Sequence, residues 1–443
     1  MLVRFVTSNF LSFDEDVELS LIPGRTRKHR DHIVRDPAWN GIDLLRIAVI
    51  YGANASGKSN LVRAMDFARN LIVEGLKPKQ SIPVKCHKLK KKCANSPSKF
   101  EFEFKRNNSY YLYGFELDVN IIHTEWLYKT TSKSQKLIYE RKTTNDGEVL
   151  VNFGDLKFSD KKYREFINFV ARGTRTNQLF LTESIQRNVK QFEEVFSWFD
   201  DVLKIVFPES KYMGKEFLPG TNYEISSSII NYLKQFDAGI ENITFNHATF
   251  ETDLGDMPDN AKRNILSDLK PGETVIVHTP EKQRFIIRMG KNNEIKIFRL
   301  MSIHKIKDTS EPVLFDIDYE SDGTLRMLDL IPALITMSET PAVFVIDELD
   351  RSLHPNLSKR LIQQFLSLKP QQNSQMIVTT HESNTLDLNV LRRDEIWFTE
   401  KDESGATNLF SLEEFAPRYD KDIRKGYLLG RFGAIPLLGR MRI

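Results

Sequence analysis

The sequence predicts an α/β fold in which a mixed sheet carries a phosphate-binding loop and a large insertion divides the core. An apolar run at residues 46–51 precedes a glycine-rich loop, and helical spacing follows over 60–73. Strand-type segments dominate the next part of the chain. From residue 324 onward, helical and strand patterns alternate as they do in a parallel sheet.

The loop after the first of these strands, GANASGKS at residues 52–59, fits the phosphate-binding pattern G-x-x-x-x-G-K-[ST]. Its glycines allow the backbone to wrap closely around an anion, and the amides at the helix start favour negative charge. Lys58 brings a positive charge to the β- and γ-phosphates, and Ser59 offers a hydroxyl to Mg²⁺. A glycine-rich turn before a core helix is the less favoured alternative. The residues expected to bind the nucleotide are Gly52, Asn54, Ala55, Ser56, Gly57, Lys58, Ser59 and Asn60.

The composition is that of an ordinary soluble protein with two or three domain-sized units. The chain has 443 residues, of which 40% are hydrophobic and 28% charged. The net charge of +3 gives no global attraction to nucleic acid. No apolar run is long enough to span a membrane, and the N-terminus lacks the pattern of a signal peptide. Two cysteines do not make a disulfide framework, so the cytoplasm is the expected location.

Two basic runs, at residues 25–30 and 85–92, are typical of solvated loops. Contact with nucleic acid or with a partner protein is the alternative for both. Cys86, His87 and Cys93 lie close together in the second run, but a zinc site needs a fourth ligand and better spacing. A zinc site at the cysteines is therefore not expected.

The part of the chain after the phosphate loop predicts an antiparallel meander. Phe100, Phe102 and Phe104 alternate with charged residues, which indicates a half-buried strand. Asn-Asp-Gly at 145–147 marks a turn. The other expected strands of this region lie at 3–7, 17–21, 110–117, 121–128 and 136–140.

The middle of the chain predicts an inserted helical lobe followed by further strands. Helical periodicity covers 162–171, 189–207 and 222–236, and strand patterns cover 273–278, 284–289 and 294–300. We therefore expect an N-terminal lobe at 1–160, a helical and β insertion at 161–310 that offers an assembly or partner surface, and a C-terminal lobe at 311–443. The two core halves are expected to meet in space.

The second half of the expected site begins with an apolar strand that ends in Asp347 and Glu348. Alone, this pattern equally fits a buried strand with charged residues at its exit. Beside a phosphate loop, Asp347 is expected to hold Mg²⁺ and Glu348 to accept a proton from the attacking water. His381 ends the next apolar strand; a structural histidine is common there, but its position favours contact with the γ-phosphate.

A serine–glycine segment opens the amphipathic helix at 325–337. The amides of Ser321-Asp322-Gly323-Thr324 are suited to meet a phosphate, and a plain N-cap by Ser321 or Asp322 is an equal alternative.

Taken together, these motifs resemble the ABC-type ATPase head, with a mixed sheet, an antiparallel β subdomain and an inserted lobe. NFLSF at 9–13 resembles the first strand of the RecF and SMC branch, and IDELDRSLHP at 346–355 resembles the OLD-like group of bacterial ATPases. The tail segments 391–398 and 427–436 resemble RloA and AbiLi-type proteins of phage-defence loci, and the PARIS ATPase AriA is similar. Residues 75–310 carry no position-specific match.

The resemblance implies ATP and Mg²⁺ as cofactors and a head-to-tail dimer, or a higher oligomer, of this chain. Each ATP is then held between the loop of one subunit and Ser321 and Gly323 of the other. The form Ser-Asp-Gly-Thr departs from the longer Leu-Ser-Gly-Gly-Gln of transporters. The implied roles are phosphate contact by Lys58, metal ligation by Ser59 and Asp347, the catalytic base at Glu348, the switch histidine at His381, and a metal-contacting glutamine at either Gln178 or Gln186.

The leading functional hypothesis is the ATPase sensor subunit of an antiphage abortive-infection system. The short tail after His381 shows no further acidic constellation, so the effector is expected on a separate chain, as a Toprim-like nuclease, with a phage protein as trigger. Three alternatives remain open: a RecF- or SMC-like DNA-associated ATPase, a nucleotide-gated scaffold with slow hydrolysis, and, least favoured, a transporter ATPase.

Overall fold

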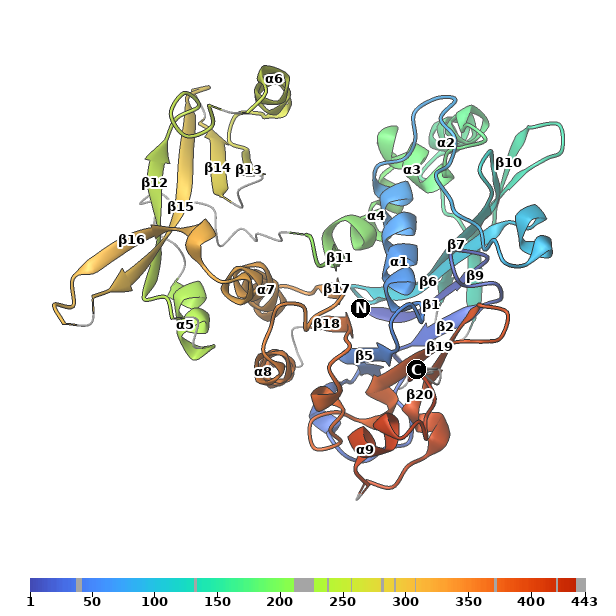
Figure 1. Ribbon diagram of the computed structural model, residues 1–443. Helices are drawn as coiled ribbons and strands as arrows, with labels where there is room; N and C mark the ends of the chain where they lie inside the picture. The colour runs from blue at the N-terminus through green and yellow to red at the C-terminus, as the bar shows by residue number, and fades with distance from the viewer. Residues whose placement is uncertain are drawn as a thin grey trace. The chain divides into compact units, whose positions relative to one another are not determined.

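The computed structural model describes most of the chain and divides it into two compact units (Figure 1). The first unit comprises Met1–Pro208, Thr340–Asp350 and Ser358–Ile443, and the second comprises Glu209–Glu339 and Arg351–Leu357. Residues 222–226 of a predicted helix and Pro436 of the tail motif lie outside the described residues. Those described are 1–36, 42–130, 134–210, 227–236, 239–255, 257–279, 283–290, 292–306, 308–369, 373–419 and 421–435.

A six-stranded mixed sheet forms the centre of the first unit. The first five of its strands, in spatial order, run parallel, and the sixth is antiparallel to its neighbour. Their apolar runs are buried, as expected for strands covered on both faces. Strands from both ends of the chain are therefore neighbours, as predicted. The spatial order is β11 (Leu203–Val206), β17 (Val343–Ile346), β18 (Gln375–Thr379), β5 (Ile47–Gly52), β19 (Ile396–Lys401) and β20 (Thr407–Ser411).

Helix α1 (Lys58–Val73) follows β5 directly, and its apolar face lies in the main core (Figure 1). Leu61, Met65, Ala68 and Ile72 are buried at the helical spacing that the sequence predicts. The strand, loop and helix expected around the glycine-rich segment are thereby confirmed.

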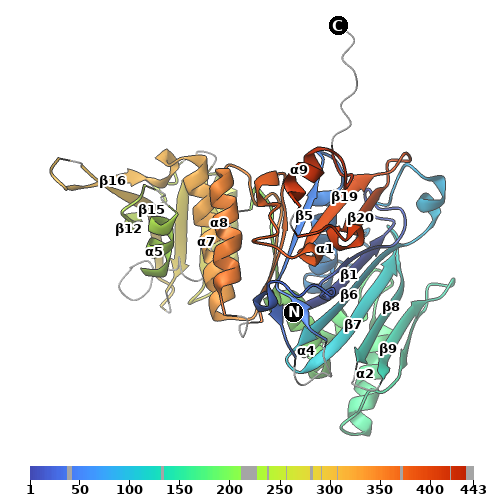
Figure 2. The ribbon, with the colours of Figure 1, turned by 90° about the horizontal axis from the view of Figure 1, so that it is seen from below.

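A seven-stranded antiparallel sheet forms the other part of the first unit (Figure 2). Phe100, Phe102 and Phe104 are fully buried and alternate with half-exposed charged residues, so the predicted meander is confirmed. The hairpin that closes it turns at Gly147, with φ +79°. The strands in spatial order are β10 (Val149–Phe153), β9 (Gln135–Thr143), β8 (Ile122–Thr130), β7 (Ser109–Leu117), β6 (Ser98–Arg106), β1 (Leu2–Ser8) and β2 (Val17–Ser20).

The helices at 161–202 pack on this first unit, whereas the sequence placed them in the insertion. Trp198 stacks on Phe104 with ring centroids 4.3 Å apart, and Phe199 meets Phe102 edge to face. These aromatic contacts bury large side chains in the main core, which accounts for the difference. The predicted helix at 189–207 also ends early, because its last residues form β11. The helical segments are α2 (Lys161–Gly173), α3 (Phe180–Gln186), α4 (Glu193–Ser197) and the turn Trp198–Val202.

The second unit is built around a five-stranded antiparallel sheet rather than a helical bundle. The strands predicted at 273–278, 284–289 and 294–300 are present. The unit also contains the helix predicted at 325–337, which the sequence had assigned to the C-terminal lobe. Its elements are α5 (Ser227–Gln235), β12 (Asn242–Ala248), α6 (Asp259–Asp268), β13 (Thr274–His278), β14 (Arg284–Met289), β15 (Ile295–Lys305), β16 (Pro312–Asp316) and α7 (Asp322–Glu339).

Shorter elements complete the first unit. None of the helices that the structure describes is long and apolar enough to cross a membrane. The other described elements are η1 (Arg30–His32), β3 (Ile33–Val34), β4 (Leu44–Leu45), η2 (Lys91–Asn95), η3 (Lys190–Phe192), α8 (Pro355–Ser367), which begins in the second unit, η8 (Ser383–Thr385), η9 (Arg393–Glu395), η10 (Leu412–Phe415) and α9 (Ile423–Leu428), with η6 (Ile317–Tyr319) in the second unit.

Candidate functional site

The loop at 52–59 joins β5 to α1, and its glycines stand where a side chain does not fit. Gly57 adopts φ +114°, a conformation that favours glycine, and a Cβ there would collide with the Thr407 side chain. A Cβ on Gly52 would lie 2.5 Å from Ser56 Oγ and from Thr399 O. The loop is therefore shaped by strands that lie more than 300 residues later in the chain.

Hydrogen bonds from β19 and β20 brace the same loop. Ser56 Oγ lies 2.6 Å from Thr399 Oγ1, and Thr407 Oγ1 donates to Ser56 O at 2.8 Å. Ser56 is buried, whereas Asn54 and Ala55 are exposed at the loop's tip. The Ser56 hydroxyl thus supports the loop's shape, and contact of Ser56 with a nucleotide stays a prediction.

The ammonium group of Lys58 is turned into the loop. Its Nζ donates to the carbonyl oxygens of Gly52 at 2.8 Å and Ala53 at 3.0 Å, and it lies 3.3 Å from His381 Nδ1. Burial lowers the pKa of Lys58 to about 8, and the neighbouring carboxylates oppose this effect. An anion that binds beside this buried ammonium group stabilises its positive charge, because the anion replaces the solvent that burial removed.

Ser59 and Asp347 meet where β17 ends. Ser59 Oγ donates to Asp347 Oδ1 at 3.1 Å, and Thr379 Oγ1 donates to the same oxygen at 2.5 Å. The Thr379 hydroxyl also accepts from the backbone amide of Glu348 at 2.8 Å. Glu348 has φ +47°, a conformation that is uncommon outside glycine and that concentrates at functional sites.

His381 follows β18 and is held by its backbone. Its amide donates to Asp350 Oδ1 at 3.2 Å and to Oδ2 at 3.3 Å. Burial, together with the Lys58 ammonium, lowers the pKa of His381, so its imidazole is neutral at pH 7 and accepts from Lys58. The structure therefore brings together Lys58, Ser59, Asp347 and His381, which the sequence predicted to share a site.

These groups fit a triphosphate with Mg²⁺. The Ser59 hydroxyl and the Asp347 carboxylate are hard oxygen ligands of the kind that Mg²⁺ prefers. Among the described residues, no side chain caps the start of α1 at Gly57. The amides of the first helical turn therefore point to where an anion would bind.

The serine–glycine segment lies in the second unit, at the start of α7. Ser321 Oγ accepts from the Thr324 amide at 3.1 Å and lies 2.9 Å from Thr324 Oγ1, which is the N-cap arrangement. A Cβ on Gly323 would come 2.9 Å from Ser352 O, so glycine is required for packing. The action of Ser321 and Gly323 on a nucleotide of another subunit stays a prediction.

A comparison with protein families matches residues 47–387 to the family described as "AAA domain, putative AbiEii toxin, Type IV TA system". The chain belongs to this AAA-domain family. The matched range runs from β5 past β18 and so includes the phosphate loop, Asp347, Glu348 and His381. Membership confirms the expected class of P-loop ATPase and its link with abortive infection. The closer resemblance to OLD-like, RloA-type and AriA proteins stays a prediction.

Solved SMC head structures are similar to this chain. For the SMC head domain from Thermotoga maritima the TM-score is 0.37 at 11% identity, covering 93% of this chain and 98% of that one. An Smc head bound to the C-winged helix domain of ScpA matches with a TM-score of 0.34 at 13% identity, covering 93% of this chain and 97% of that one. The Pyrococcus furiosus Smc head with an extended coiled coil, bound to the C-terminal domain of ScpA, matches with a TM-score of 0.36 at 13% identity, covering 94% of this chain and 97% of that one. No curated protein matches the chain.

The first unit of this AAA-domain protein combines a mixed core sheet with an antiparallel sheet, as predicted. Strand β18 lies between the loop strand β5 and the acid strand β17, and the antiparallel sheet belongs to the same compact unit. The predicted fold class is thus confirmed.

Neither glutamine proposed as a metal contact lies beside the loop. Gln178 Oε1 accepts from the Leu76 amide at 3.1 Å, and Gln186 lines a cleft with Asn70 and Glu74. Both positions adjoin the C-terminal end of α1, whose 16 residues place it about 24 Å from the loop. The glutamine prediction is therefore wrong for both, because the resemblance that implied it carries no position-specific match in this part of the chain.

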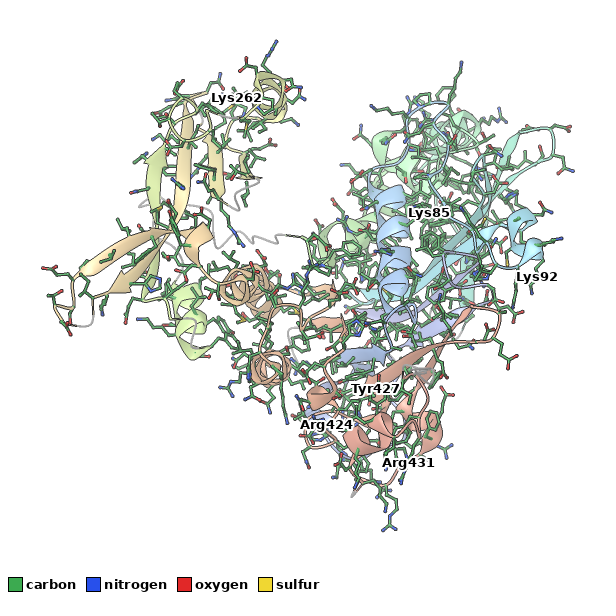
Figure 3. The ribbon with its side chains drawn as sticks, in the orientation of Figure 1. Lys85, Lys92, Lys262, Arg424, Tyr427 and Arg431 are labelled. Atoms are coloured by element: carbon green, nitrogen blue, oxygen red, sulfur yellow. The ribbon has the colours of Figure 1, made fainter. Side chains whose placement is uncertain are left out.

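Two lysines of the second basic run pair with an acidic loop. Lys90 pairs with Asp14, and Lys92 Nζ lies 3.0 Å from Glu15 Oε1; Lys92 extends from the surface in Figure 3. Pairing of these lysines with carboxylates makes them a poor phosphate-binding patch. Cys86 and Cys93 are free, and among the described residues neither belongs to a group of potential metal ligands.

Sequence reasoning missed the residues that support the loop. Asn60 Nδ2 donates to Ser12 Oγ at 2.8 Å, so Asn60, predicted to contact nucleotide, is tied to the N-terminal segment. Thr379 and Asp350 orient Asp347 and His381. Polar residues at or shortly after the ends of apolar strands were a usable signal for both.

Proposed function

We propose that this AAA-domain protein binds Mg·ATP at the loop and hydrolyses it. The observation that carries the proposal is the convergence of Lys58, Ser59, Asp347 and His381 from three separate parts of the sequence. Magnesium, when bound, neutralises phosphate charge and orients the phosphates. Ser59 and Asp347 hold the metal, and the Lys58 ammonium binds the phosphate oxygens. Glu348 accepts the proton of the attacking water.

Two substitutions separate binding from turnover. Lys58→Ala removes the phosphate-binding cation and is expected to weaken nucleotide binding, measured by titration with a fluorescent ATP analogue. Glu348→Gln keeps the shape of the side chain, so binding is retained while phosphate release falls at least a hundredfold. Normal hydrolysis by Glu348→Gln would remove Glu348 from the base role. ATP-driven assembly with negligible wild-type turnover would favour the nucleotide-gated scaffold instead.

We further propose that hydrolysis controls a separately encoded effector, a Toprim-like nuclease, in an antiphage abortive-infection system, with a phage protein as trigger. The family's link with toxin–antitoxin systems supports this role, as does the resemblance of the tail to RloA-type proteins. An ATP-sandwiched dimer is the expected active form. Mass photometry of Glu348→Gln with and without ATP tests the dimer, since nucleotide should shift the mass upward.

The effector is tested with the product of the neighbouring gene, co-expressed with this protein. Toxicity or nuclease activity that changes with Lys58→Ala supports control by the ATPase site. A gene product that neither binds this chain nor responds to Lys58→Ala contradicts it. Stimulation of hydrolysis by duplex DNA, with a steep decrease as salt rises, would favour the DNA-associated alternative.

A further inference from the structure

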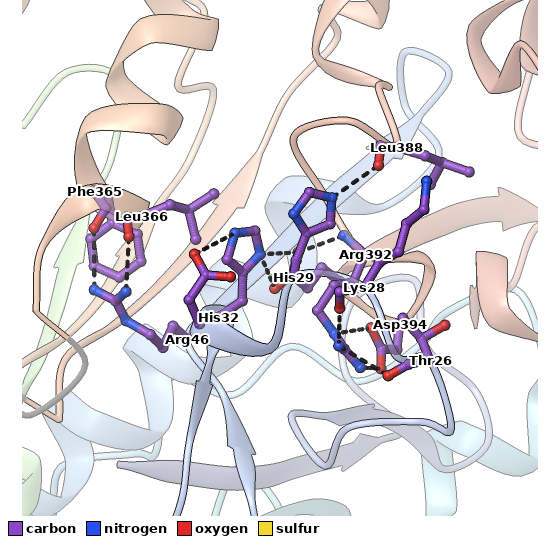
Figure 4. A network of polar contacts seen from close by, with 12 residues as sticks. Thr26, Lys28, His29, His32, Arg46, Phe365, Leu366, Leu388, Arg392 and Asp394 are labelled. Atoms are coloured by element: carbon purple, nitrogen blue, oxygen red, sulfur yellow. Dashed lines mark hydrogen bonds and ion pairs between the residues drawn. The ribbon is translucent and has the colours of Figure 1, made fainter. Parts of the chain in front are cut away.

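Two histidines and an aspartate lie together on the first unit, away from the residues assigned to the nucleotide. His29, Asp31 and His32 each offer a ligand atom, and these atoms all lie within 4.8 Å of one another. The two rings are stacked, with centroids 4.9 Å apart (Figure 4). His32 is buried, His29 is half-buried, and the side chain of Asp31 is 74% exposed. We propose that this cluster binds a divalent transition-metal ion of the Zn²⁺ class.

The hydrogen bonds of both histidines select the tautomers that a metal needs. His29 Nε2 lies 3.0 Å from the carbonyl oxygen of Leu388, which only accepts, so the ring proton is on Nε2 and Nδ1 carries a lone pair (Figure 4). His32 Nδ1 lies 3.0 Å from Glu395 Oε1, while Nε2 is 4.0 Å from Asp31 Oδ2. The His32 ring therefore donates from Nδ1, and Nε2, on the side of Asp31, is the nitrogen that can bind a metal.

This is the outer shell expected around metal-binding histidines, which donate their other N–H to a carboxylate or a backbone carbonyl. Glu395 is itself fixed, because Oε2 accepts from the Arg392 amide at 2.7 Å. Arg46, held by the carbonyl oxygens of Phe365 and Leu366, offsets part of the charge of the two carboxylates. The cluster keeps a negative charge for a cation.

Metal binding requires only a small shortening of the distances between the ligand atoms of His29, Asp31 and His32. Zinc bonds to nitrogen and oxygen of about 2.0–2.1 Å place tetrahedral ligands about 3.3 Å apart. The ligand atoms, which lie within 4.8 Å of one another, must therefore approach by at most about 1.5 Å, and rotation of the exposed Asp31 side chain brings its carboxylate closer. Three protein ligands leave the fourth position to water.

The contacts to Leu388 and Glu395 engage one nitrogen of each ring, and the cluster of His29, Asp31 and His32 keeps three potential ligand atoms within 4.8 Å of one another. His29 adopts φ +50°, which is uncommon outside glycine, at the turn that brings its ring over His32. An ion at this place would be ligated by residues of a single turn at 29–32, and Leu388 and Glu395, from the segment between β18 and β19, would form its outer shell.

The test uses the full-length, nucleotide-free protein, dialysed against Zn²⁺ in the presence of excess Mg²⁺, with metal content measured per chain. We expect one Zn²⁺ per chain, and Co²⁺ in its place should give the intense visible bands of a four-coordinate ion. Asp31→Asn and His29→Ala should each lower Zn²⁺ affinity at least tenfold. Asp31 is exposed, so its substitution leaves the fold intact.

Two matched variants control for other ligands. His123→Ala disrupts a similar surface pair, in which His123 Nε2 lies 2.8 Å from Asp118 Oδ2 and to which the described residues add no third ligand. Cys86→Ser removes a free thiol. Both should retain wild-type affinity. Absence of Zn²⁺ binding by the wild type, or equal binding by Asp31→Asn, overturns the proposal, and neither result affects the assignment of the nucleotide site.

Discussion

Thr379→Val tests the hydrogen bonds that connect the two acids of the site. Thr379 is fully buried, and its hydroxyl donates to Asp347 at 2.5 Å and accepts from the Glu348 amide at 2.8 Å. Valine keeps the shape of the side chain but leaves a buried carboxylate oxygen and an amide without this partner. Hydrogen bonds to charged groups contribute about 1.5–3 kcal/mol and neutral ones about 1 kcal/mol, so the loss should be about 2.5–4 kcal/mol.

The matched control is Thr174→Val. Thr174 is also buried, and its hydroxyl makes one neutral hydrogen bond, to Val170 O at 2.9 Å, so the loss should be about 1 kcal/mol. Urea unfolding measures both variants. Thr379→Val should also raise the Mg²⁺ concentration that gives half-maximal ATP hydrolysis, because Asp347 is less well oriented. Equal stability of the two variants with unchanged Mg²⁺ dependence would refute the coupling.

Three further predictions concern the loop and the histidine. The pKa of Lys58 is about 8 in the folded protein against 10.5 in the unfolded chain. Nucleotide affinity should therefore fall as the pH rises above about 8, because Lys58 loses its charge, and Lys58→Arg should abolish this fall. The stability of the nucleotide-free protein should rise between pH 8 and 10.5, because the unfolded chain binds the proton more tightly. Gly57→Ala should reduce nucleotide affinity at least tenfold, whereas Gly147→Ala, at an open hairpin with φ +79°, should leave it unchanged. Asp350→Asn should lower kcat with little change in nucleotide affinity, because Asp350 holds only the backbone of His381; loss of affinity with normal kcat would contradict this.

Local patterns were sufficient to predict the elements in which buried residues recur at a regular spacing along the chain. The alternation of Phe100, Phe102 and Phe104 predicted a strand, and the apolar run before Gly52 predicted a buried one, because each strand's own residues satisfy the period. The helix at 189–207 was a different case. Its final residues form β11, whose strand pairing with β17 is a contact with residues more than 130 positions away. Strand pairing over such a separation overrides a local helical pattern.

The sequence alone determined which residues have the chemistry of a nucleotide site. Lys58, Ser59, Asp347 and His381 stand next to strand ends, and the carboxyl ends of parallel strands meet at one edge of a sheet. Only the tertiary structure decided what supports them. The bracing hydroxyls of Thr399 and Thr407, and the cluster of His29, Asp31 and His32 facing Glu395, depend on strand order and on contacts between the two ends of the chain. A sequence specifies side chains locally, whereas the distances between them arise from how the strands are paired and packed.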